Sequence, residues 1–133
     1  MNLRSAETGL AYLTLGGLII YVPLETYASL PELWDPFYLV DLIGMALLGA
    51  GTFKSLRARP LSSLALLCAG YAWTGANGWR AFWGRVAEVG KGGTLEFGTT
   101  ELWVVGIGTA LALGCLALSV LLVVRQGDRN AQG

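Results

Sequence analysis

Four long, mostly apolar runs divide this chain, and they constrain its fold more than any other feature. The runs cover residues 8–30, 36–53, 61–84 and 101–124. About 20 helical residues, at about 1.5 Å each, cross a hydrocarbon core about 30 Å thick. Because a backbone in lipid must satisfy its own hydrogen bonds, we expect each run to be a helix. The sequence therefore predicts one all-α transmembrane domain over residues 1–133, with four spans.

The composition agrees with a membrane protein and excludes several other classes. Apolar residues make up 54% of the chain and charged residues 14%, against about 25% charged in a typical soluble domain. These proportions argue against a soluble globular domain and against a disordered chain. The net charge of zero, without a basic cluster, argues against a nucleic-acid partner. The absence of histidine excludes a His-ligated metal and a Ser-His-Asp triad within the chain, and we expect neither a metal site nor a cofactor.

Lysine and arginine predict the orientation. Six lie at the two ends and in the second connector: Arg4, Lys54, Arg57, Arg59, Arg125 and Arg129. Three lie on the opposite side: Arg80, Arg85 and Lys91. The first connector adds only acids there, Glu32 and Asp35. By the positive-inside rule both termini are expected to be cytoplasmic. Short connectors predict an up-down four-helix bundle. The expected location is the cell membrane, namely a bacterial inner membrane.

The connectors and the chain ends give more local expectations. Pro36 and Pro60 stand where the second and third helices should begin, a position that accepts proline. The residues from 126 to 133 are polar and are expected to form a frayed tail. Arg4 followed by an apolar stretch resembles a signal peptide, but Glu7 and the lack of a clear A-x-A site argue against cleavage.

Small residues within the runs predict close helix packing. Gly106, Ala110 and Gly114 recur every fourth residue, and such ridges bring helices together in lipid. The ridge fits packing inside the bundle or a homodimer face, and both interpretations stay open. Cys68 and Cys115 lie in apolar runs without a CxxC pattern. We interpret them as core residues and leave open whether they pair.

Ionisable residues inside spans are expensive, so each is a functional candidate. Counting at 1.5 Å per residue, Glu25 and Asp41 each lie about 7 Å inside the outer ends of their helices. Asn77 and Arg80 lie about 10 and 6 Å inside the outer end of the third helix on the same count. Four polar groups from three runs are thus expected at one depth. We expect Arg80 to pair with Asp41, Glu25 or both, because an unpaired charge there is costly.

Helical spacing also places polar residues on common faces. On the first run, Thr14, Gly17, Tyr21 and Glu25 form one stripe. On the third run, Tyr71, Thr74, Asn77 and Arg80 form another, with Trp73 beside it. The predicted ligand-binding residues are Tyr21, Glu25, Asp41, Trp73, Thr74, Asn77 and Arg80.

Several functions fit this outer-leaflet cluster. It is either a satisfied ion network that fixes helix register, or a pocket whose net negative charge suits a cation, an exchangeable proton or a polar head group. The leading hypothesis is a non-catalytic protein that binds a lipid-like or small polar ligand, or a partner subunit, in the membrane. One alternative is an isomerase or cyclase acting on a lipophilic small molecule, with Asp41 or Glu25 as acid or base. Another is a small proton-coupled transporter acting as a homodimer.

The stretch from Val40 to Gly51 carries an acidic residue and three glycines, and is followed by a basic connector and the apolar run 61–72. This order resembles the second and third helices of DoxX-like membrane proteins, which are small four-helix chains. The resemblance covers residues 40–72. It implies an accessory role beside membrane redox enzymes and carries over only Asp41 as a site residue.

Overall fold

The computed structural model describes residues 3–28, 30, 36–57, 60–95 and 98–131. Within this part of the chain all regular structure is helical, which confirms the all-α prediction. The helices are α1 (Leu3–Ala28), α2 (Pro36–Leu56), α3 (Pro60–Gly90) and α4 (Thr99–Ala131). Glu32, Asp35 and Arg59, which entered the charge count above, lie outside the described residues.

The helix boundaries agree with the proline positions and extend beyond the apolar runs. Pro36 and Pro60 are the first residues of α2 and α3, as predicted. The helix α4 continues to Ala131, through the segment expected to fray, and α3 continues to Gly90. An apolar run shows only which part of a helix suits lipid. Polar residues such as Gln, Arg and Glu also favour a helix, so the helix can continue into water. The helices are therefore longer than the predicted spans.

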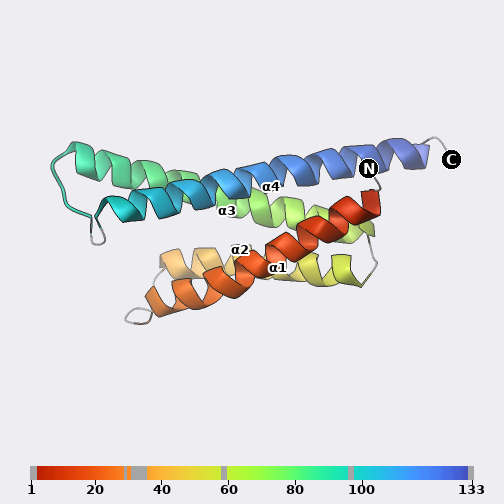
Figure 1. Ribbon diagram of the computed structural model, residues 1–133, viewed down its shortest axis with the longest axis horizontal. Coiled ribbons are helices and arrows are strands. Elements are labelled where there is room, and N and C mark those ends of the chain that lie inside the picture. Colours follow the sequence, from red (N-terminus) through yellow and green to blue (C-terminus); the bar gives the residue numbers. More distant parts are fainter. Residues whose placement is uncertain (1–2, 29, 31–35, 58–59, 96–97, 132–133) are drawn as a thin grey trace.

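The helices lie lengthwise beside one another, and α3 occupies a central place (Figure 1). The main contacts join α2 to α3 and α3 to α4. The helix α1 packs mainly on α2 and makes a smaller contact with α4. The start of α1 and the end of α4 lie toward the same end of the molecule (Figure 1), which we call the inner end; the opposite end is the outer end.

Glycines set the register between α2 and α3. A Cβ atom on Gly51 would meet Leu67, and one on Gly70 would meet Leu48, so the two helices approach closely and run in opposite directions. By this register Pro36 lies level with Phe82. The last eight residues of α3 therefore project beyond α2 by about 12 Å, at about 1.5 Å per residue, and Figure 1 shows this projection of the α3–α4 hairpin.

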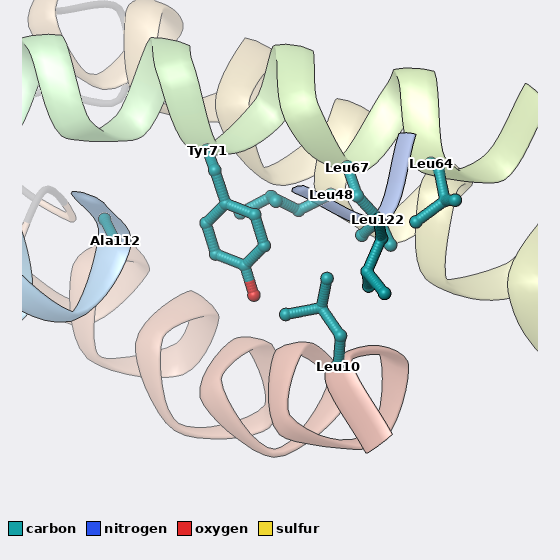
Figure 2. Packing of buried hydrophobic residues seen from close by; sticks show 7 residues of the cluster. All are labelled: Leu10, Leu48, Leu64, Leu67, Tyr71, Ala112 and Leu122. Atoms are coloured by element: carbon teal, nitrogen blue, oxygen red, sulfur yellow. The ribbon is translucent and has the colours of Figure 1, made fainter. Parts of the chain in front are cut away.

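The core lies nearer the inner end and draws on every described helix. Its buried members are Leu10, Leu48, Leu64, Leu67, Tyr71, Ala112 and Leu122 (Figure 2). The Tyr71 side chain extends from α3 with its hydroxyl group toward α1. Because lipid is as apolar as leucine, this core contributes through close packing rather than through removal of apolar surface from water.

Three of the helices are long and apolar enough to cross a membrane: Leu3–Tyr27, Tyr38–Leu56 and Thr99–Asp128. Large apolar side chains on them face outward; Ile20 is 71% exposed and Leu111 64%. Such continuous exposed apolar surface is unfavourable in water and normal in lipid. These helices indicate a membrane protein by length and composition. The predicted third span, 61–84, falls in α3. This helix is not among those long and apolar enough to cross a membrane, so the third span stays a prediction.

Candidate functional site

Two carboxyl groups meet where α1 packs on α2 near the outer end. The Glu25 and Asp41 side chains interact by charge and by a hydrogen bond. Tyr21, one turn before Glu25 on α1, interacts with both carboxyl groups and shares a hydrogen bond with Glu25. All three side chains are partly buried. We refer to Glu25 and Asp41 as the acid pair.

A second contact holds the same ends of α1 and α2 together. The hydroxyl groups of Thr26 and Tyr38 lie 3.1 Å apart and form a hydrogen bond. Both groups are neutral; Thr26 follows Glu25 directly on α1, and Tyr38 stands three residues before Asp41 on α2. The bond joins the two helix ends and adds no charge near the acid pair.

The third helix contributes neutral groups at the level of the acid pair. Trp73 donates its indole N–H to the carbonyl of Val40, at 2.8 Å, directly beside Asp41 in sequence. Gly44 makes room for this approach, because a Cβ atom there would lie 3.0 Å from the Thr74 hydroxyl and 3.1 Å from the Trp73 ring. The Asn77 amide donates to the carbonyl of Trp73, at 3.0 Å. The α2–α3 register places Asn77 level with Asp41.

Arg80 lies exposed on α3 and has an interaction of its own. Its predicted pairing with Asp41 or Glu25 stays a prediction, since the interactions found for Asp41 come from Glu25 and Tyr21. An ion pair forms farther out, between Arg85 on α3 and Glu101 on α4. Glu101 lies in the first turn of α4, and the sequence alone did not predict its pairing with Arg85. The pairing depends on the α3–α4 register, which the glycine-rich connector does not specify.

The small-residue ridge of α4 divides between two environments. A Cβ atom on Gly106 would meet the Phe82 ring at 3.1 Å, whereas nothing lies within 4 Å of Gly114. Between α3 and α4 lies a shallow depression of about 150 Å³, lined by Trp79, Phe82, Gly106, Thr109, Ala110 and Leu113. The acid pair lies outside it. Gly106 thus serves packing inside the molecule, whereas open space lies beside Gly114, and the homodimer face stays a prediction.

One residue of each polar stripe predicted on the first and third runs meets its counterpart in the core, Thr14 from α1 and Tyr71 from α3. The Tyr71 hydroxyl lies 2.6 Å from Thr14 Oγ1, and Thr14 donates to the Leu10 carbonyl at 2.7 Å. Cys68 donates to the Ser119 hydroxyl, at 3.2 Å, and both Cys68 and Cys115 are free thiols. The cysteine pairing left open by the sequence is absent between these two residues.

A second buried polar group lies at the inner end, and the sequence analysis did not predict it. Glu7 Oε1 accepts hydrogen bonds from Ser63 at 2.7 Å and from Ser55 at 3.1 Å. Glu7 precedes the predicted first span, so it entered the sequence argument only as evidence against a signal peptide. The spacing contained a signal: Glu7 stands seven residues before Thr14, so it continues the same helix face by two turns.

No family model, curated protein or solved structure matches the chain. Function is therefore inferred from the residues and their geometry. Within the described ranges, no group of three or more His, Cys, Asp or Glu side chains is arranged to hold a metal ion. The chemistry available at the acid pair is that of two carboxyl groups, a phenol and neighbouring hydroxyl, indole and amide groups.

Proposed function

We propose that the chain is a multi-pass membrane protein in which α3 forms the fourth span of an up-down bundle. The position of α3 supports this proposal, because it packs against both α2 and α4. A helix covered on two sides by other helices needs less apolar surface than one that faces lipid. An even number of spans puts both termini on one side, and the positive-inside rule makes that side cytoplasmic.

Cysteine labelling tests this topology. In a background with Cys68→Ala and Cys115→Ala, we expect Thr94→Cys to react with a membrane-impermeant maleimide on intact cells. Ser5→Cys and Asp128→Cys should react only after permeabilisation. Three spans, with α3 outside the membrane, would put the two ends on opposite sides. Labelling of just one of the two end variants on intact cells would therefore contradict the proposal.

We propose further that the acid pair binds a small polar ligand with a positive charge, such as the ammonium head group of an amphiphile, without catalysis. The observation that carries this proposal is the contact between Glu25 and Asp41. A structural ion network alternates opposite charges, whereas this contact brings two acids together. Like groups in contact disfavour ionisation of both, and charge inside a span is costly. A cation between the two carboxylates removes both penalties.

A stability screen with matched amphiphiles tests the binding. The purified protein in mild detergent is heated with an alkylamine, an alkyltrimethylammonium or an alkyl phosphate of one tail length. We expect the two cationic compounds to raise the unfolding midpoint and the phosphate to leave it unchanged. The rise should disappear in Asp41→Asn and persist in Glu88→Gln, an exposed acid on α3. An equal rise with the phosphate, or a full response of Asp41→Asn, would count against the acid pair as the site.

A proton-coupled transporter is a second candidate, favoured by the hydrogen bond within the acid pair. Two carboxyl groups in contact can share one proton. A cation that enters between them would displace that proton. Ligand binding in weakly buffered detergent should then release protons, and no release at any pH from about 5 to 9, the range of raised carboxyl groups, would exclude this candidate.

A further inference from the structure

We propose that Glu7, Thr52, Ser55 and Ser63 form a second site, for a monovalent metal cation of about the size of sodium, at the inner end of the molecule. We refer to these residues as the inner oxygen site. It shares no residue with the acid pair and does not depend on the function proposed for that pair.

The first support is the convergence of oxygen atoms from three helices. Glu7 belongs to α1, Ser55 to α2 and Ser63 to α3. Both serine hydroxyls lie on the same carboxylate atom, Glu7 Oε1, at 3.1 and 2.7 Å. Glu7 is 7% exposed, Ser55 8% and Ser63 0%. The oxygen atoms are thus already gathered and shielded from solvent, as hard cations require of their ligands.

The second support is a hydroxyl group without a partner. Thr52 is 3% exposed, and its Oγ1 atom is buried with no hydrogen-bond partner. Buried polar atoms are nearly always bonded, so each exception needs an explanation. Thr52 stands three residues before Ser55 on α2, which places both side chains on one face of the helix. A cation held by Glu7 and the serines would give the Thr52 oxygen a partner.

The negative charge of Glu7 and the oxygen ligands of the site determine which cation fits best. One carboxylate balances one positive charge, so a monovalent ion leaves the site neutral in the membrane. Carboxylate and hydroxyl oxygens suit hard cations, whereas softer metals prefer thiolate or imidazole ligands. In membrane transporters, oxygen atoms at the C-terminal ends of helices coordinate sodium ions, and Thr52 and Ser55 lie close to the C-terminal end of α2. The site therefore fits a sodium-like ion better than a divalent or transition metal.

Basic residues lie around this end of the molecule and limit the affinity of the inner oxygen site for a cation. Arg57 lies over the Phe53 ring, with its guanidinium carbon 4.0 Å from the ring centre. Arg4 and Arg125 are exposed, Lys54 is partly exposed, and Arg4 has an interaction of its own. These positive charges reach the solvent, where water and salt screen them. They weaken the attraction of the buried Glu7 carboxylate for a cation.

The experiment measures thermal unfolding in mild detergent at constant ionic strength. Sodium, lithium or potassium chloride replaces N-methylglucamine chloride, whose cation is too large for the inner oxygen site. We expect a saturable rise in the midpoint with sodium, and a smaller rise with potassium. Asp41→Asn, in which only the acid pair is changed, should keep the sodium response, as should Glu88→Gln. That result separates this site from the acid pair.

Substitutions within the site complete the test. Glu7→Gln should abolish the sodium response, and Ser55→Ala should shift it to higher sodium concentration. Ser55→Ala removes one hydroxyl group only, so it reports on the site even where Glu7→Gln fails to fold. A midpoint that is the same in all four salts, or a wild-type sodium response in Ser55→Ala, would overturn the proposal. In that case Glu7 is held by its serine hydrogen bonds alone.

Discussion

Replacing Gly51 with alanine should lower the free energy of unfolding by about 1–3 kcal/mol, the usual cost of overpacking a close contact. The added Cβ atom would lie 2.9 Å from the Leu67 backbone nitrogen and 2.9 Å from Leu67 Cγ. A side chain can rotate away from such a contact, but a backbone atom moves only if the helix moves. Because α2 packs against α3 along much of its length, the shift would disturb other contacts between the two helices.

Gly49 provides a matched control on the same helix. Nothing lies within 4 Å of a Cβ atom at that position. Gly49→Ala should therefore be neutral, or stabilising by up to about 1 kcal/mol through helix propensity. Unfolding with SDS in mixed micelles compares the two variants under one condition. Equal stability of Gly51→Ala and Gly49→Ala would show that α2 and α3 do not approach as closely as described.

Asp41→Asn should weaken binding of an alkylamine by about tenfold to a hundredfold, which corresponds to losing one charge-assisted hydrogen bond of about 1.5–3 kcal/mol. The change keeps the size of the side chain and removes its negative charge. Glu25→Gln should have a similar effect, since both carboxylates would contact the ammonium group. Isothermal titration in detergent measures the affinities directly.

A variant of a neighbouring neutral contact shows whether binding depends on carboxylate charge or on the position of the two helices. Thr26→Val removes the hydrogen bond to Tyr38, which joins the same ends of α1 and α2, but leaves both acids in place. We expect Thr26→Val to bind the alkylamine with near wild-type affinity. A loss as large as that of Asp41→Asn would mean that the affinity depends on the α1–α2 contact rather than on carboxylate charge.

Local sequence signals predicted most of the helical structure. Pro36 and Pro60 mark helix starts because a first-turn proline loses no hydrogen bond, and both begin helices in the structure. The predicted third and fourth spans ended before α3 and α4 do in the structure. Apolarity stops near the membrane boundary, whereas hydrogen bonding along a helix continues wherever the residues favour it.

Helix faces were easier to predict than partners between helices. Residues three or four apart share a face, and two stripes found in this way meet at the bond between Thr14 and Tyr71. Which charges pair depends on how far one helix is shifted along the next. The pairs Arg85–Glu101 and Glu25–Asp41 depend on such shifts, and Glu7 was missed because the predicted span began one residue too late.

Native mass spectrometry of the protein, extracted from its own membrane in mild detergent, tests the acid pair as a binding site most directly. We expect a discrete adduct whose mass and fragmentation identify a molecule with an amine or quaternary ammonium group. The adduct should be absent from Asp41→Asn and present in Glu88→Gln. A wild-type protein without any adduct, or an adduct that persists in Asp41→Asn, would exclude ligand binding by the acid pair and direct the search to a partner complex.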